Sequence, residues 1–309
     1  MVNVSVIVPV LNRKDLVLRS LDSILNQTKM PQELIVVDNG SVDGTLETVA
    51  RWMEQHKDTV IKFKLLSENK KGAFAARQKG LNESIGDYVI FFDSDDEMNP
   101  DLLEKAIEAV EEDKFTDIVC WKCRLHLLDG QTKVPPFDVK DPLENHLIHT
   151  LLRPQGYLVK RSFIEKAGGW GKNLKVWDDL ELGLRLLLRN PKVKAVPVIL
   201  ANIHSTVESI TGKDFSSKAG EWEITLDEME KEAKENGGEK ESRILKILNY
   251  RRAILAAHYR REGNNKEASR LISEAYRKES GIVKFILRFV YRYTSAGFRG
   301  AWRLVRFAY

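Results

Sequence analysis

Short apolar runs alternate with helical segments over the first half of the chain. The runs are rich in β-branched and aromatic residues and predict buried strands over Val4–Val10, Leu34–Val37, Val60–Leu66 and Tyr88–Phe92. Between them, apolar residues recur every three or four positions and predict helices over Asp15–Gln27, Thr45–Gln55 and Ala73–Glu83. Strands separated by amphipathic helices are typical of a parallel sheet that is covered on both faces. We therefore predict an α/β fold with helices on both faces of a mostly parallel sheet.

The pattern changes in the second half of the chain. Further strands are predicted over Asp117–Leu128, Tyr157–Val159 and Val193–Leu200, and a helix over Asp178–Arg189. Beyond about Gly212 the strand pattern stops, and helices are predicted over Glu221–Glu235, Glu241–Arg261 and Lys266–Lys278. The sequence thus predicts an α/β domain over residues 1–212 and a helical C-terminal region over residues 213–309.

Composition and charge narrow the class of protein. The chain is 43% hydrophobic and 30% charged, which excludes a wholly disordered chain. Its two cysteines cannot form a disulfide scaffold, so a reducing, cytoplasmic compartment is expected. No uncharged apolar run reaches the roughly 18 to 20 residues that span a bilayer, and Val4–Leu11 lacks the preceding basic segment of a signal peptide. Acidic residues outnumber basic ones over residues 1–210, and the reverse holds over residues 211–309.

Acidic side chains follow the buried strand that ends near Phe92. Four of the five residues from Asp93 to Glu97 are acidic, and close carboxylates repel one another unless a cation neutralises them. Mg²⁺ or Mn²⁺ suits such an all-oxygen site. An acidic turn at a helix start is the alternative interpretation, and Asn99-Pro100 does predict a helix with Asn99 as its N-cap. The buried strand and the polar loop after Val37 favour the metal site, because the carboxyl ends of parallel strands share one edge.

Several segments, in order and spacing, resemble a family 2 glycosyltransferase of the GT-A type. They are VSVIVPVLNR, VVDNGSVDGT, ENKKGAFAARQKGLNESIGDYVIFFDSDD and, further on, GGW and WDDLELGLR. The resemblance covers residues 3 to about 205. It implies a GT-A nucleotide-binding sheet and inverting transfer of a sugar from a nucleotide-diphosphate sugar, with a UDP sugar favoured. The implied acceptor is a hydroxyl of a glycan or of a lipid-linked molecule, as in cell-surface polysaccharide synthesis.

The resemblance also implies roles for single residues. The positions that match donor-binding residues are Pro9, Asn12, Asp38, Gly72, Arg77, Asp93 and Ser94. Those that match ligands of a divalent metal, Mn²⁺ or Mg²⁺, are Asp95 and, more loosely, His204. Asp179 matches the catalytic base, and Trp170 and Asp178 lie on the acceptor side. Leu11 stands where many members have an aromatic residue, so the nucleobase stays open.

The chemistry of the reaction agrees with these assignments. A diphosphate leaving group gains negative charge as the sugar–oxygen bond breaks, and a divalent ion at Asp95 would stabilise it. The attacking hydroxyl must lose a proton, for which one carboxylate suffices, and a single in-line displacement inverts the anomeric carbon. Asp179 opens a predicted helix, whose dipole favours the ionised form. Without the family pattern, helix capping would be the preferred interpretation of Asp178-Asp179.

The last 29 residues combine basic and aromatic side chains, and no acidic residue occurs after Glu279. The basic ones recur at near-helical spacing and are Lys284, Arg288, Arg292, Arg299, Arg303 and Arg306. A basic amphipathic helix of this kind is typical of contact with an anionic membrane surface. We therefore expect a peripheral protein on the inner face of the cell membrane. The alternatives are a helix packed against the catalytic domain and a homodimer interface.

Two other functions remain open at this point. A nucleotide-sugar pyrophosphorylase or nucleotidyltransferase also combines an α/β sheet with acidic metal ligands. Such enzymes usually carry a Gly-rich basic loop after the first strand, where this chain has Pro9–Arg13. A non-catalytic nucleotide-sugar binder would not need both the acidic cluster and Asp179. A nucleic-acid partner is not expected, because an acidic cleft has the wrong charge for it.

Overall fold

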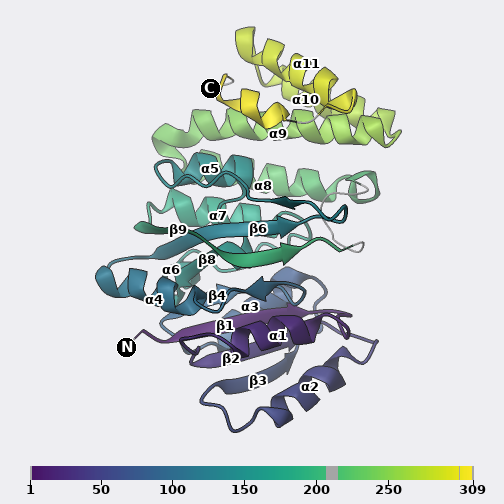
Figure 1. Ribbon diagram of the computed structural model, residues 1–309. Helices are drawn as coiled ribbons and strands as arrows, with labels where there is room; N and C mark the ends of the chain where they lie inside the picture. The colour runs from purple at the N-terminus through teal and green to yellow at the C-terminus, as the bar shows by residue number, and fades with distance from the viewer. Residues whose placement is uncertain (1, 207–214, 299, 308–309) are drawn as a thin grey trace. The chain divides into compact units, whose positions relative to one another are not determined.

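The chain divides into two compact units, residues 1–207 and residues 208–309 (Figure 1). The computed structural model describes residues 2–206, 215–298 and 300–307, without the side chain of Trp302. The predicted boundary between residues 212 and 213 and the predicted basic residue Arg299 lie outside the described residues. The boundary therefore stays a prediction.

The first unit is built on one mixed sheet. The strand order is β3-β2-β1-β4-β8-β6-β9-β5, and β7 pairs with β6. β1 pairs in parallel with β2 and β4, and β2 in parallel with β3, whereas β8 runs antiparallel between β4 and β6. The strands are β1 (Val4–Val10), β2 (Glu33–Asp38), β3 (Lys62–Ser67), β4 (Tyr88–Phe91), β5 (Glu97–Met98), β6 (Ile118–His126), β7 (Thr132–Lys133), β8 (Tyr157–Lys160) and β9 (Val193–His204).

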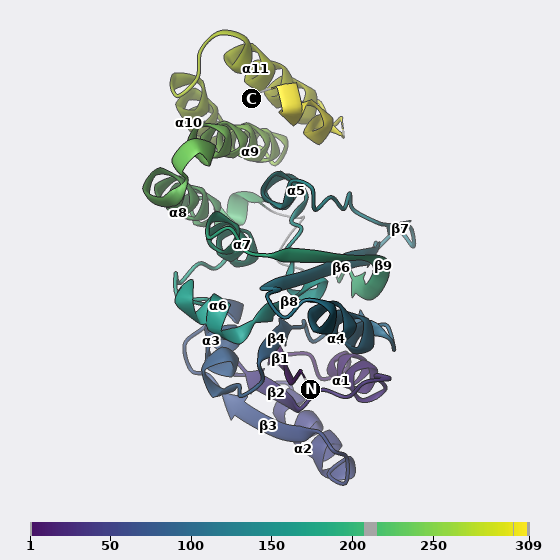
Figure 2. The same ribbon diagram turned by 90° about the vertical axis from the view of Figure 1, so that its left-hand side faces the viewer.

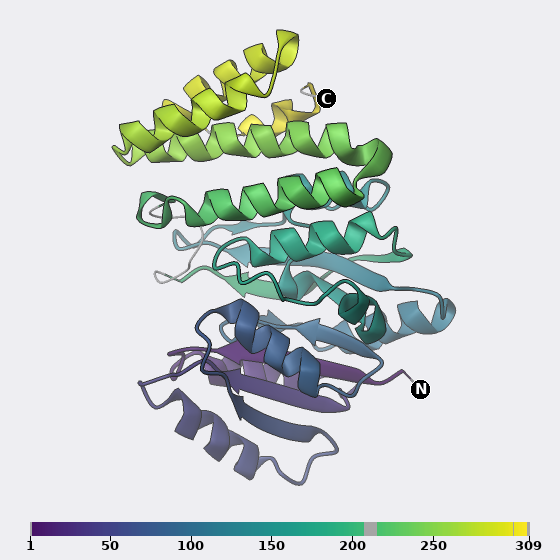
Figure 3. The ribbon, with the colours of Figure 1, turned by 180° about the vertical axis from the view of Figure 1, so that it is seen from behind.

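Helices cover both faces of this sheet, as predicted. Figure 2 shows α1 and α4 on one side and α3 and α6 on the other, and α3 lies across β1 and β2 (Figure 3). All residues of β1 and β2 are buried, which explains why these strands lack polar alternation. The helices are α1 (Val17–Leu25), α2 (Thr45–Gln55), α3 (Ala73–Glu83), α4 (Leu102–Glu112), α5 (Pro142–His149), α6 (Arg161–Lys166) and α7 (Asp178–Leu188).

The predicted helix with Asn99 as its N-cap starts two residues too early. Glu97–Met98 forms β5 and pairs with Ala201 and Asn202 of β9, so the chain is still extended there. The side-chain amide of Asn99 donates to the carbonyl of Ile199 instead of capping a helix (2.8 Å). α4 begins at Leu102, after Asp101. The long-range pairing of β5 overrides the local Asn-Pro signal.

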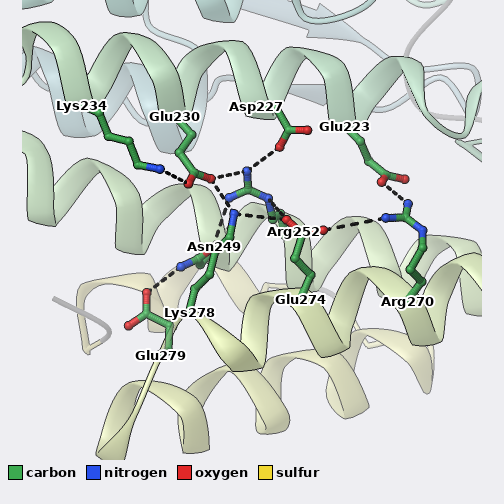
Figure 4. A network of polar contacts seen from close by, with 10 residues as sticks. All are labelled: Glu223, Asp227, Glu230, Lys234, Asn249, Arg252, Arg270, Glu274, Lys278 and Glu279. Carbon is green, nitrogen blue, oxygen red and sulfur yellow. Dashed lines mark hydrogen bonds and ion pairs between the residues drawn. The ribbon is translucent and has the colours of Figure 1, made fainter.

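The second unit is helical, as predicted. Its helices are α8 (Glu221–Asn236), α9 (Glu241–Arg261), α10 (Asn265–Arg277) and α11 (Gly281–Ser295), with a 3₁₀ segment over Ala301–Phe307. The long helix α9 packs against each of the other three. Arg252 of α9 is buried and pairs with Asp227 and Glu230 of α8 at 2.9 and 2.6 Å (Figure 4). A polar network therefore joins helices that also share an apolar core.

Candidate active site

The ends of β1 and β2 bring three predicted donor-binding residues to one corner of the sheet. Pro9 lies in β1, and Asn12 and Asp38 follow at the strand ends. The backbone N–H of Asn12 donates to Oγ of Ser41, and Oδ1 of Asn12 accepts from the backbone N–H of Val42, both at 2.9 Å. The carboxylate of Asp38 accepts from the backbone N–H of Ser41 (3.1 Å). Each loop thus holds the other in place.

Gly72 lies where the chain enters α3. Its φ is 121°, and a Cβ atom here would come 2.4 Å from the ring of Phe74, so the position requires glycine. The N–H of Gly72 donates to Oδ1 of Asn39 (2.8 Å), and the side-chain amide of Asn39 donates to the carbonyl of Lys70 (2.8 Å). Because Asn39 follows Asp38, these bonds fix the start of α3 beside the end of β2.

Arg77 on α3 joins three parts of the site. Its Nη2 donates to Asp93 and its Nη1 to Asp178, both at 2.8 Å, and its guanidinium lies 4.7 Å from the ring centroid of Trp170. Burial opposes the charged guanidinium, but the carboxylates of Asp93 and Asp178 outweigh this effect and raise the pKa of Arg77. Both ends of the guanidinium are occupied by carboxylates. In this arrangement Arg77 connects the acidic loop to the start of α7.

Asp95 occupies the loop that follows β4, next to the buried Ser94. Nε of Arg13 lies 3.4 Å from Oδ2 of Asp95, a longer contact than the 2.8 Å pair between Arg77 and Asp93. Burial, and after it the charge of Asp93, raise the pKa of Asp95, and Arg13 offsets this in part. A carboxylate in such surroundings is stabilised when a further cation approaches.

His204 is the last residue of β9 and faces the acidic loop. Its backbone N–H donates to Oδ1 of Asp96 (2.8 Å), and its ring stacks on His126 with centroids 4.6 Å apart. Nε2 is buried without a hydrogen-bond partner among the described residues, and Oε2 of Glu97 lies 3.5 Å away. Burial and the charge of Arg19 lower the pKa of His204. The neutral ring is the form that binds metals.

A divalent cation fits these side chains as part of a site that the donor completes. Over the described ranges, no three His, Cys, Asp or Glu side chains form a metal cluster by themselves. Mg²⁺-type sites typically take one or two carboxylates and complete their shell with phosphates and water. Asp95 has a raised pKa, and Nε2 of His204 is buried with Oε2 of Glu97 3.5 Å away. The role of these two residues as metal ligands stays a prediction.

Asp178 and Asp179 open α7 directly after Trp177, whose φ of 51° lies in the left-handed region. Asp178 is engaged by Arg77, whereas no described cationic side chain forms an ion pair with Asp179. Burial, and after it the charge of Asp178, raise the pKa of Asp179 to about 6. The charges of Arg77 and Arg153 offset this in part. A carboxylate with this pKa is suited to accept a proton near neutral pH.

Trp170 is buried beside Arg77, between β4 and α3. Its ring contacts Phe91 edge-on with centroids 5.1 Å apart and carries Arg77 on its face. The backbone N–H of Trp170 donates to Oε1 of Gln78 (2.6 Å), and Arg185 of α7 donates to the carbonyl of Gly169 (2.7 Å). The ring thus supports Arg77, and the predicted contact of Trp170 with the acceptor stays a prediction.

Two residues of the site were not predicted from the sequence. Arg13 follows Asn12 in the first loop and contacts Asp95. Gln155 lies about sixty residues beyond the acidic loop, yet its side-chain amide contacts both Asp93 and Asp96. Arg13 could have been suspected from its place in the VSVIVPVLNR segment. Gln155 belongs to no motif, and only the pairing of β8 with β4 brings it to the site.

Known proteins share both sequence and fold with this chain. Residues 5–146 match the model of the glycosyl transferase family 2. The cholesterol galactosyltransferase of Borreliella burgdorferi is 28% identical over 212 residues, which are 62% of this chain and 57% of that protein. The putative teichuronic acid biosynthesis glycosyltransferase TuaG of Bacillus subtilis is 39% identical over 109 residues, 35% of this chain and 42% of that protein. The chain therefore spans less than two thirds of the length of these relatives.

Solved structures show the same fold over nearly the whole chain. S. aureus TarS 1-349 in complex with UDP-GlcNAc has a TM-score of 0.69 at 19% identity, covering 99% of this chain and 91% of that one. The mannosyltransferase PcManGT of Pyrobaculum calidifontis, in complex with GDP-Man and Mn²⁺, has a TM-score of 0.61 at 20% identity, covering 99% and 86%. The predicted GT-A type of α/β fold with a helical C-terminal region is thereby confirmed. Residues 5–146 are therefore similar to glycosyl transferase family 2, within a fold that these solved structures share.

Proposed function

We propose that the protein is an inverting, metal-dependent glycosyltransferase that moves a sugar from a nucleoside-diphosphate sugar to an acceptor hydroxyl. The observation that carries this proposal is that the carboxylates of the site differ in their cationic partners. Asp93 and Asp178 are engaged by Arg77. Asp95 has the long contact with Arg13, and Asp179 is paired with no described cation. Asp93 and Asp178 hold the site together through Arg77. We propose that Asp95 binds the metal and that Asp179 accepts the proton.

The residues of the site account for each step of such a transfer. Asp38, at the end of β2, would bind the nucleoside, and Asp95 and His204 would hold Mn²⁺ or Mg²⁺. The bound cation supplies neutralisation of the charge that develops on the departing diphosphate. Asp179 would accept the proton of the attacking hydroxyl. Because the base and the leaving group act on opposite sides of the anomeric carbon, the configuration inverts.

The related proteins support a choice of substrate classes. TarS binds UDP-GlcNAc, and a UDP sugar is therefore the favoured donor here. One relative is named a cholesterol galactosyltransferase and another a teichuronic acid biosynthesis glycosyltransferase. We propose a glycan or a lipid-linked acceptor, within the synthesis of cell-surface polysaccharides.

The face of α11 that points away from α9 supports contact with an anionic membrane. Leu287, Val290 and Tyr291 are buried, whereas Ile282 and Phe285 are 68% and 65% exposed and Phe289 is 47% exposed. These three exposed residues, the α11 outer face, recur at helical spacing. Exposed basic residues flank them, namely Arg288 and Arg292. An apolar stripe with basic flanks fits the headgroup region of an anionic bilayer. None of the described helices has the length and apolar character that crossing a membrane requires.

This surface supports our proposal that the protein binds the inner face of the cell membrane, in the cytoplasm, where it would reach a lipid-linked acceptor. The same apolar stripe could instead be covered by a second copy of the chain, which would give a homodimer. A membrane and a second copy of the chain would respond differently to the basic residues beside the apolar stripe. A dimer interface gains nothing from them, whereas each basic residue strengthens binding to an anionic membrane by about 1 kcal/mol.

The test of the proposed function is nucleotide binding with and without metal. We expect UDP to raise the melting temperature of the wild-type protein, and Mn²⁺ to increase that shift, because bound ligands stabilise the folded state. Asp95→Ala is expected to lose the additional shift with Mn²⁺ while keeping the shift with UDP alone. GDP under the same conditions tests the choice of base. An Mn²⁺ effect that survives in Asp95→Ala would contradict the ligand role of Asp95.

A further inference from the structure

Gln155 is held rigidly beside the acidic loop. It lies in the 3₁₀ turn Pro154–Gly156, directly before β8, and is buried. Its backbone carbonyl accepts from Nε1 of Trp121 (2.8 Å) and lies 3.7 Å from Sγ of Cys123, both in β6. The backbone of Gln155 is therefore fixed by the centre of the sheet, and its side chain extends from a defined point.

The side-chain amide of Gln155 joins two carboxylates. Nε2 donates to Oδ2 of Asp93 and to Oδ2 of Asp96, both at 2.6 Å. A primary amide has two N–H groups, so each carboxylate receives one of them. Hydrogen bonds to ionised acceptors are shorter and stronger than those between neutral groups. Gln155 thus contributes two strong bonds from one nitrogen atom.

The two carboxylates share this partner, and they differ in their access to water. Asp96 is buried, whereas the side chain of Asp93 is 31% exposed. The other donor to Asp96 is the backbone N–H of His204, and the other donor to Asp93 is Arg77. Without the amide of Gln155, the buried carboxylate of Asp96 would lose a hydrogen-bond donor that water does not readily replace.

We propose that Gln155 is a positioning residue that turns Asp93 and Asp96 inward and so leaves Asp95 as the carboxylate that faces the metal and the diphosphate. This inference rests on the proposed function. It also has a physical consequence that does not depend on metal. Gln155 and Asp96 must be energetically coupled in the protein without any ligand, because the amide donates to the buried carboxylate of Asp96 and holds it beside Asp93.

The first experiment measures UDP affinity by calorimetry, with and without Mn²⁺. Gln155→Met keeps the length of the side chain and removes both hydrogen bonds. We expect the Mn²⁺-dependent part of UDP affinity to fall by roughly 10- to 100-fold, the usual effect of losing a partner that orients a metal ligand. UDP affinity without metal is expected to stay within about twofold, because Asp38 and its loop are unaffected. An unchanged Mn²⁺ effect would overturn the proposal.

The matched control is Gln27, another buried glutamine of the same unit. Its Nε2 donates to the carbonyls of Ser23 and Asn99, and its Oε1 accepts from the N–H of Leu103. Gln27→Met therefore loses a comparable set of hydrogen bonds, to Ser23 and to Asn99 and Leu103 just beyond the acidic loop, and none of them is to Asp93 or Asp96. We expect this variant to lose stability but to keep the Mn²⁺ effect on UDP affinity. An equal loss of the Mn²⁺ effect in both variants would show a general structural role only.

The second experiment is a double-mutant cycle on the melting temperature without ligands. Gln155→Met is expected to lower Tm by roughly 4–10 °C. Asp96→Asn should raise Tm more in the Gln155→Met background than in the wild type, because it removes a buried carboxylate that has lost its Gln155 donor there. Equal shifts in both backgrounds would overturn the proposal. If Gln155→Met does not fold, Gln155→Asn, which is one methylene shorter and cannot reach both carboxylates, takes its place.

The two experiments separate this inference from the proposed function. If wild-type protein binds UDP equally with and without Mn²⁺, the proposed metal dependence fails, and with it the role of Gln155 in presenting Asp95. The cycle still decides whether Gln155 positions Asp93 and Asp96. If wild type shows the Mn²⁺ effect and Gln155→Met retains it, the proposed function stands and the role of Gln155 fails.

Discussion

Asp178 and Asp179 are neighbours in the sequence with different electrostatic surroundings. The carboxylate of Asp178 is 2.8 Å from Nη1 of Arg77, whereas Asp179 forms no ion pair with a described side chain. Burial and then the negative charge of Asp178 raise the pKa of Asp179, and the charges of Arg77 and Arg153 offset this in part. The charge of Asp178 thus contributes to the proton affinity of Asp179.

This arrangement predicts the pH dependence of sugar transfer. A base must be ionised to accept a proton, and the pKa of Asp179 is raised to about 6. Transfer should therefore rise as the pH increases through about 6 and fall about tenfold per unit below it. Asp178→Asn removes the neighbouring charge and should move this acidic limb to lower pH. Asp179→Asn should keep UDP binding and lose transfer. Steady-state rates between pH 4.5 and 8 check these results, and an active Asp179→Asn variant would place the base elsewhere.

Most of the side chains that the structure brings together were predicted from the sequence, but the contacts that hold them were not. Asp93–Asp96 and Asp179 stand in recognisable segments, because the chemistry proposed for them needs fixed residue types at fixed places in the chain. Gln155 needs only to reach two carboxylates, and many segments could supply such an amide. Its place depends on β8 pairing antiparallel with β4, a contact that local sequence patterns do not encode. Arg77 was predicted near the donor, and its links to Asp93 and Asp178 emerged only from the structure.

The bounds of helices with a strong apolar periodicity were predicted closely. The bounds of elements that depend on pairing between strands far apart in the sequence were not. Thr45–Gln55 and Ala73–Glu83 are helices over the predicted residues, because their apolar faces pack on the sheet. The start of α4 was predicted too early, since β5 extends the chain through Met98. Likewise, β9 continues beyond the predicted Leu200 to His204, because its second half pairs with Lys122–His126 of β6.

The α8–α9–α10 array depends on a buried charge, which predicts a local loss of stability. Arg252 of α9 is almost fully buried and pairs with Asp227, Glu230 and, at 3.8 Å, Glu274 (Figure 4). Arg252→Met leaves these acids without their shared cation and should destabilise the array by about 3 kcal/mol. Lys234→Met removes an exposed partner of Glu230 and should cost less than about 1 kcal/mol.

Hydrogen exchange of the folded protein distinguishes these outcomes. In Arg252→Met, protection should fall over residues 221–277 and stay unchanged over the sheet of the first unit. Equal protection in Arg252→Met and Lys234→Met would show that apolar packing alone holds the array together.

At the scale of the whole molecule, charge and exposed apolar surface predict where the protein is found. Basic residues predominate in the second unit, and the α11 outer face adds apolar contact to their attraction for anionic lipid. We expect co-sedimentation with vesicles containing phosphatidylserine, weakened as salt rises from 0.05 to 0.5 M in roughly the range where surface charges are screened. Vesicles of neutral lipid should bind far less.

Replacing Ile282, Phe285 and Phe289 together by serine tests the apolar part of this contact. Vesicle binding should fall by at least about tenfold, because each side chain loses on the order of 1–2 kcal/mol of burial. Phe115→Ser, at an aromatic residue of the first unit that is more exposed than these three, serves as the control and should bind like wild type. A triple variant that still binds vesicles but changes its sedimentation coefficient would assign this face to a homodimer.

The two-sided use of α11 has a kinetic consequence. Leu287, Val290 and Tyr291 already anchor this segment within the protein, so its backbone is ordered before any lipid is met. A segment that is unfolded in solution must fold each time it binds a membrane, and it must unfold or detach as a helix to dissociate. A helix that is already formed can bind and dissociate quickly. The protein would then bind many positions on a bilayer in a short time. The number of products formed in each membrane-binding event would depend on the density of acceptor molecules in the bilayer.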